Sequence, residues 1–193
     1  MSLYKITMQH TEESLVKLSH MQYDLFCQSN KNARTIISFA VILLAVTVVD
    51  TEWLKYVLIA YAGFLLTGSY NSSNRTARKL AEQIKASGLP FPASRFEFEN
   101  TAMHIFSLPE DKEINEPLPY SKIFKLGEDL EYLYIFRDQY GGYMLPKTAL
   151  GEKKDEFKAF IEGKTKMKFV RRATPMSRMS GWLKKREDEP YHL

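Results

Sequence analysis

The sequence has a single cysteine, Cys27, in 193 residues. One cysteine excludes an internal disulfide and any metal site built from several cysteines, and it is compatible with a cytosolic environment for most of the chain. The four histidines, His10, His20, His104 and His192, are not spaced as metal ligands relative to one another or to Cys27. The sequence therefore predicts no metal site, and we interpret the thiol as a buried or interfacial side chain rather than a nucleophile.

The patterns that usually accompany catalysis are also missing. Gly141 and Gly142 lack the spacing of a phosphate-binding loop and fall between two strand-like runs, so they predict a hairpin turn. Asp111, Glu113 and Glu116 share one loop-like stretch without the defined pairing that general acid–base catalysis requires. The sequence therefore predicts a protein that is not an enzyme, with no catalytic residues and no cofactor.

The sequence also lacks a hydrophobic run of the length that normally spans a bilayer. Its two most apolar stretches, residues 35–49 and 56–70, contain no charged residue. A helix made of such a run is about 22 Å long, whereas the hydrocarbon core of a bilayer is roughly 30 Å thick. Length alone therefore favours two helices buried in a protein core. The first ten residues lack the pattern of a cleaved signal peptide, so we expect any membrane segment to be an uncleaved internal anchor.

Charged and aromatic residues favour a different interpretation, a two-helix transmembrane hairpin. The segment between the runs is acidic, whereas cations flank the pair on the outside: Lys31, Arg34, Arg75, Arg78 and Lys79. The positive-inside rule then places both ends in the cytoplasm. Trp53, Tyr56 and Tyr70 lie near the ends of the second run, as interfacial aromatic residues do. Both runs are apolar on every side, and a chain this short has little other material to cover them.

Small residues predict how the two helices of the hairpin pack. Ala60, Gly63 and Thr67 share one face of the second helix, where a partner helix could approach closely. Ser38 and Ala45 could supply the matching face of the first helix. We expect these five residues to form the packing surface of the membrane hairpin.

The remaining periodicity predicts an α+β protein. Thr11, followed by Glu12 and Glu13, is typical of a helix start, and from residue 94 the period changes from helical to alternating. We expect the N-terminal strand to be able to join the later sheet. The expected strands are residues 2–9, 96–99, 103–107, 120–126, 130–136 and 142–145, with a turn at 127–129, and the expected helices outside the hairpin are 11–29, 76–86 and 152–162.

The order of these elements resembles the YcxB-like family of small bacterial membrane proteins. The resemblance is carried by the short apolar hairpin, the strands within residues 124–136 and the segment YMLPKTAL at residues 143–150 that leads into a helix. It implies a two-helix membrane anchor and a C-terminal module similar to a bacterial pleckstrin-homology domain. The expected divisions are an N-terminal strand and helix (1–31), the membrane hairpin (32–74), a connecting helix (75–93), the pleckstrin-homology-like β domain with its C-terminal helix (94–163) and a basic tail (164–193).

The basic tail accounts for the positive charge of the chain. From residue 164 onward there are nine Lys or Arg residues and three acids, which gives 9 − 3 = +6, so the rest of the chain carries +4 − 6 = −2. Lys184, Lys185, Arg186 and Trp182 are the residues expected to contact an anionic membrane surface. A solvated tail is the alternative, and nucleic-acid binding is disfavoured because no reader fold accompanies the charge.

Together these observations predict a non-enzymatic binding or regulatory module in the bacterial inner membrane, with both termini and the β domain in the cytoplasm. Its partners would be the lipid bilayer and a protein that docks on the exposed sheet edge or on the loop of residues 109–119, and homo-oligomers remain an option. An alternative is an immunity-type protein that neutralises a toxin or secreted effector. A soluble enzyme with a buried hairpin is the third hypothesis. The resemblance to pleckstrin-homology domains does not imply phosphoinositide binding, because the sequence shows no matching basic loop.

Overall fold

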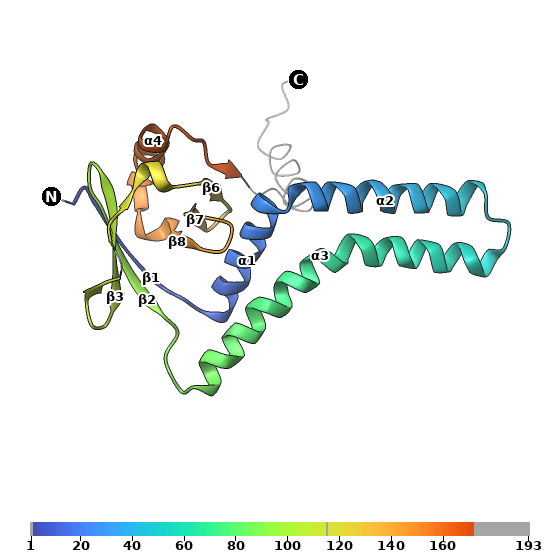
Figure 1. Cartoon of the computed structure of the whole chain (residues 1–193), viewed down its shortest axis with the longest axis horizontal. Helices are drawn as coiled ribbons and strands as arrows, with labels where there is room; N and C mark the ends of the chain where they lie inside the picture. The colour runs from blue at the N-terminus through green and yellow to red at the C-terminus, as the bar shows by residue number, and fades with distance from the viewer. Residues whose placement is uncertain (1, 115, 172–193) are drawn as a thin grey trace, which may run out of the picture.

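The computed structural model describes residues 2–114 and 116–171, which form an α+β domain with a long helical hairpin projecting from it (Figure 1). The expected mixture of helices and antiparallel strands is confirmed. Two sheets build the domain, and α1 (Glu12–Phe26) links the domain to the hairpin of α2 (Gln28–Thr47) and α3 (Glu52–Ala86).

The first sheet joins the N-terminus to the middle of the chain. Its strand order is β1 (Tyr4–Gln9), β2 (Ala93–Phe98), β3 (Ala102–Leu108) and β4 (Lys112–Glu113), and β5 (Leu118–Pro119) also pairs with β3. In the antiparallel register Ile6 lies opposite Phe96, which lies opposite Ile105, and all three side chains are buried. The N-terminal strand therefore joins the sheet as expected. In the sequence, the whole hairpin is inserted between β1 and β2, which pair with each other in space.

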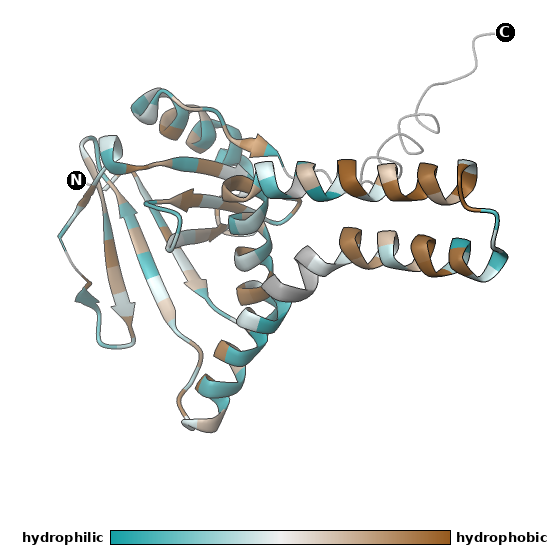
Figure 2. Cartoon of the chain, turned by 45° about the vertical axis from the view of Figure 1, so that its right-hand side comes forward, coloured by the Kyte–Doolittle hydropathy of each residue, from teal (hydrophilic) through white to brown (hydrophobic). Residues whose placement is uncertain are grey.

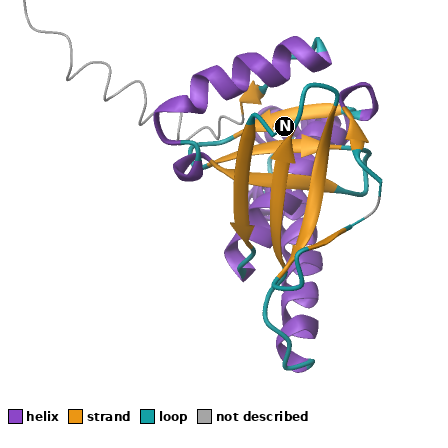
Figure 3. Cartoon of the chain, turned by 90° about the vertical axis from the view of Figure 1, so that its left-hand side faces the viewer, coloured by secondary structure: helices purple, strands orange, loops and turns teal. Residues whose placement is uncertain are grey.

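The second sheet has the order β8 (Gly142–Pro146), β7 (Tyr132–Phe136), β6 (Lys125–Glu128) and β9 (Val170–Arg171), in which only β9 runs parallel to its neighbour. Its strands cross behind those of the first sheet, and α4 (Lys154–Thr165) lies across one end of both (Figure 3). Phe157 of α4 is fully buried. The centroid of its ring lies 4.8 Å from that of Phe98 and 5.1 Å from that of Tyr4. The aromatic side chains of both sheets and α4 form one core.

The helix α1 begins where the sequence predicts. Thr11 accepts a hydrogen bond from the Ser14 N–H through its side chain, and the Ser14 hydroxyl accepts one from the Thr11 N–H, so the two residues cap the helix reciprocally. The helix then packs on β6, where a Cβ on Gly127 would lie 2.8 Å from the Met21 sulfur. A side chain at position 127 would force the Met21 and Leu25 side chains to move, so glycine allows α1 to pack closely on the sheet.

Three local expectations are corrected. The helix expected at 76–86 is the C-terminal part of α3, because the Asn and Ser residues that precede it do not end a helix as Pro would. The strand expected at 120–126 begins at Lys125, since Tyr120–Lys122 forms a 3-10 turn in which the Tyr120 hydroxyl donates to the Glu99 carbonyl at 2.6 Å. Gly127 and Glu128, expected in a turn, belong to β6.

Candidate functional site

The helical hairpin is the most unusual part of the molecule, and small residues hold its two helices together. Ser38 and Ala45 of α2 and Ala62 of α3 are completely buried, and the two helices pack against each other. The Ser38 hydroxyl donates to the Arg34 carbonyl at 2.8 Å, so its burial leaves no unsatisfied donor. Side chains of this size allow two helical backbones to approach closely.

The small residues proposed for α3 occupy a different face. Ala60, Gly63 and Thr67 are exposed, and a Cβ on Gly63 would meet nothing within 4 Å. The expectation that they face Ser38 and Ala45 is corrected, because two residues of helix turn the chain by about 200° and so separate Ala60 from the buried Ala62. No sequence pattern distinguishes Ala62, since every face of this run is apolar.

Large apolar side chains cover the outside of the hairpin. Figure 2 shows α2 and the first half of α3 coloured as predominantly hydrophobic. The large apolar residues exposed on the two helices have exposed fractions from 39% for Leu66 to 69% for Ile36. Their number far exceeds the scattered apolar residues of an ordinary surface, so this surface requires a cover other than water.

The transmembrane character expected of the hairpin stays a prediction. Among the residues that the structure describes, no helix combines the length and the hydrophobicity needed to cross a bilayer.

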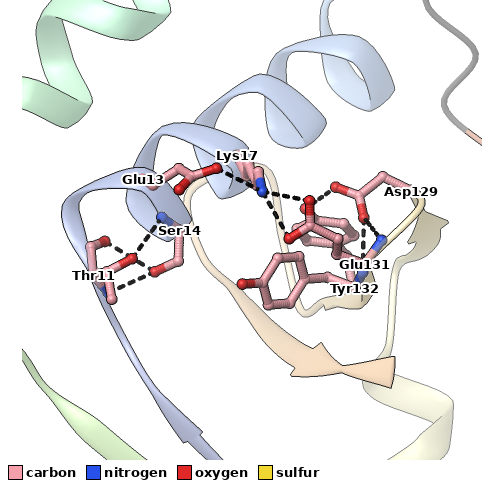
Figure 4. Close-up of polar contacts among 8 residues, drawn as sticks. Thr11, Glu13, Ser14, Lys17, Asp129, Glu131 and Tyr132 are labelled. Carbon is pink, nitrogen blue, oxygen red and sulfur yellow. Dashed lines mark hydrogen bonds and ion pairs between the residues drawn. The ribbon is translucent and has the colours of Figure 1, made fainter. Parts of the chain in front are cut away.

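Polar contacts fix α1, the helix that leads into the hairpin, to the domain. The Lys17 ammonium of α1 lies 2.8 Å from a carboxylate oxygen of Glu13 and 2.8 Å from one of Glu131 in the β6–β7 turn (Figure 4). Burial alone would lower the pKa of Lys17, but its bonds to these two carboxylates outweigh burial and raise it. Asp129 shapes the same turn by accepting from the N–H groups of Glu131 and Tyr132 at 2.8 and 2.7 Å.

The other side of α1 contacts α3. The Lys85 ammonium reaches the Glu12 carboxylate at 2.5 Å, and His20 bonds to Asn74. Ala77 and Ala81 of α3 are buried where the two helices pack. Contacts on two faces of α1, one to the β6–β7 turn and one to α3, therefore determine the direction in which the hairpin leaves the domain.

The described residues contain no group of three His, Cys, Asp or Glu side chains that could hold a metal ion. His104 lies on the outer face of the first sheet, 2.7 Å from Glu113, and His10 lies 3.3 Å from the Ser14 hydroxyl. Burial lowers the pKa of His10, so its neutral form is favoured. Cys27 is half-buried between α1 and α2. His192 and the predicted membrane-surface residues Trp182, Lys184, Lys185 and Arg186 lie outside the described residues.

These features define a class of protein. Its members have an α+β domain whose first two strands are separated in the sequence by an apolar helical hairpin. Residues 110–162 match the family model of the YcxB-like proteins. The matched segment runs from the loop after β3 through β4 to β8 and most of α4, and β9 lies outside it. The resemblance inferred from the sequence is thus confirmed over this segment. No curated protein matches the chain.

Proposed function

We propose that the protein is a non-enzymatic binding module anchored in the bacterial inner membrane by the α2–α3 hairpin. The exposed apolar surface of the hairpin is the observation that carries the proposal. Keeping apolar surface in water is unfavourable by about 25 cal/mol per Å², so a surface of this extent strongly favours a lipid environment. A bilayer also explains why small residues, rather than large ones, lie between the helices, since lipid covers the large ones equally well.

The charges at the two ends of the hairpin support one topology. Arg75 and Arg78 of α3 are exposed near its base, whereas Asp50 and Glu52 lie at its tip. The positive-inside rule then keeps the domain and both ends of the hairpin in the cytoplasm. Each apolar run is only about 22 Å long as a helix. The proposal therefore includes local thinning of the bilayer and an outward reach of Lys55 at the tip.

We further propose that the domain is pleckstrin-homology-like. Two packed, mainly antiparallel sheets with a C-terminal helix across one end support this assignment. In this arrangement the anchor holds a rigid domain at the membrane surface, where a protein partner can reach it. Toxin neutralisation stays a prediction that no observation on the described residues favours.

Membrane fractionation with an alkaline carbonate wash tests the anchor. We expect the full chain to remain in the pellet, and a C-terminal tag to resist protease added to spheroplasts. Release of the protein by carbonate would contradict the anchor.

Cysteine labelling tests the topology. In a Cys27→Ser background we expect Thr51→Cys, at the tip, to react with a membrane-impermeant maleimide added to spheroplasts. Glu82→Cys, an exposed position on the domain side of α3, serves as the matched control and should react only after lysis. Labelling of both positions before lysis would overturn the cytoplasmic assignment. Labelling of neither would overturn a hairpin that crosses the bilayer.

A further inference from the structure

Two of the most exposed aromatic residues of the domain lie at one end of the second sheet. Phe124 precedes β6 and is 60% exposed, and Tyr140 lies in the β7–β8 turn and is 83% exposed. The Phe124 N–H donates to the Phe136 carbonyl at 2.8 Å, which places Phe124 beside the end of β7. The Asp138 carboxylate accepts from the N–H groups of Tyr140 and Gly141 at 2.7 and 2.8 Å and so orders the turn that carries Tyr140.

The same end of the sheet contacts the junction where the hairpin begins. The Phe124 ring stacks on that of Phe26, the last residue of α1, with 5.8 Å between centroids. Tyr140 lines a hollow of about 440 Å³ together with Phe26, Cys27 and Thr76 of α3. Phe124 and Tyr140 therefore flank the point from which the apolar helices leave the domain.

Charged side chains lie at both ends of the second sheet. Lys122, Lys125 and Arg137 lie at the end near the hairpin, with Asp138 paired to Arg137 at 3.3 Å. Lys125 lies 4.7 Å above the Phe26 ring and donates to the Leu25 carbonyl at 2.5 Å. The opposite end, formed by the β6–β7 turn, carries Glu128, Asp129 and Glu131, but lysines pair with two of these carboxylates: Lys147 and Lys158 with Glu128, and Lys17 with Glu131. Aromatic residues mixed with cations are typical of surfaces that sit among phospholipid headgroups.

We propose that the end of the second sheet marked by Phe124 and Tyr140 is a second membrane contact, which binds anionic phospholipid headgroups and fixes the tilt of the domain. The inference rests on the proposed function, since the hairpin must first bring this end to the bilayer. Phe124 and Tyr140 enter the headgroup layer, Lys122 and Arg137 face lipid phosphates, and the β6–β7 turn, whose Glu128 and Glu131 are paired with lysines, points away from the surface.

Fluorescence of the full chain in proteoliposomes tests the contact. Trp53 and Trp182, the two tryptophans of the chain, are replaced by Phe, and Tyr140→Trp is introduced as the probe. Leu130→Trp is the matched control, because Leu130 is 74% exposed in the turn at the opposite end of the sheet. The vesicles contain phosphatidylcholine with or without phosphatidylglycerol, and brominated phosphatidylcholine serves as quencher.

We expect the tryptophan of Tyr140→Trp to shift to shorter wavelength and to lose intensity with brominated lipid, more strongly when phosphatidylglycerol is present. The tryptophan of Leu130→Trp should show neither change. Equal quenching at both positions, or none at either, in a protein that still resists carbonate would overturn the second contact and leave the hairpin anchor intact. Quenching of the same strength with and without phosphatidylglycerol would overturn the binding of lipid phosphates by the cations. Release by carbonate would overturn the anchor and this inference with it.

Discussion

In the α+β domain the largest side chains are the most deeply buried, whereas in the hairpin of α2 and α3 the smallest ones are. Tyr134, Phe136 and Phe157 are fully buried in the domain, and Ser38, Ala45 and Ala62 are fully buried in the hairpin. The domain thus hides apolar surface from water, and its stability depends on that burial. The outer face of the hairpin is exposed, so its apolar side chains add no such burial. The two regions of the chain therefore follow opposite rules of side-chain burial.

Truncating one phenylalanine in each region should separate them most clearly. Phe157→Ala removes a fully buried ring from the domain and should lower its free energy of unfolding by about 3–5 kcal/mol. Phe64→Ala removes a ring that is exposed on the hairpin and should change the same quantity by less than about 0.5 kcal/mol. Urea unfolding in mild detergent measures both variants. If Phe64→Ala lowered the free energy of unfolding as much as Phe157→Ala does, the contrast between the domain and the hairpin would be wrong.

Enlarging one alanine on each face of the hairpin is the next test. Ala45→Leu inserts three carbons into the contact between α2 and α3 and should destabilise the hairpin by about 1–3 kcal/mol. Ala60→Leu, on the exposed face of α3, is the matched control and should leave it unchanged. Thermal loss of helical circular dichroism in detergent measures both. A larger destabilisation by Ala60→Leu than by Ala45→Leu would show that Ala60, Gly63 and Thr67 face α2 after all.

Acid should affect the domain and spare the hairpin. Burial alone would raise the pKa of Glu128, but Lys158, 2.7 Å away, and Lys147 outweigh it, so the pKa is lowered. Because the folded pKa lies below the unfolded one, this stabilisation is present at neutral pH. It is lost as the pH falls below about 4.5 and through the folded pKa.

Glu128→Gln should therefore lower the unfolding free energy of the domain by roughly 1 kcal/mol at pH 7 and reduce its loss on acidification. Urea midpoints at pH 7 and pH 4 measure the effect, with the exposed Glu152→Gln as control. The helical signal of the hairpin should not change over this range. Equal acid sensitivity in Glu128→Gln and the parent chain would refute the role of this carboxylate.

Local patterns were sufficient to predict the helix start at Thr11, the break between the two apolar helices and most strands. Each depends on residues close together in sequence, such as a capping hydroxyl or an alternating run. Tyr120 was misassigned because its β propensity was outweighed by a tertiary bond to the Glu99 carbonyl. The division of the strands into two sheets depends on pairings that no local period encodes.

The candidate site was predictable in outline but not in detail. The apolar composition predicted a hairpin and identified Ser38 and Ala45, which are buried. It could not separate Ala60 from Ala62, because a run that is apolar on every side has no periodic contrast. Phe124 and Tyr140 are distant in sequence from the hairpin, and only the packing of Phe26 brings that end of the sheet to its base.

The pairing of β1 with β2 also sets an order of events during synthesis. Ile6 must wait for Phe96, its partner in the register, until the ribosome has delivered both helices of the hairpin. At about 5–20 residues per second this wait lasts roughly 5–20 seconds, long compared with the formation of a helix. The antiparallel return of α3 along α1 then brings the two strands together and reduces the entropy lost on closing so long a loop. The first sheet can thus close only after the whole hairpin has been synthesised.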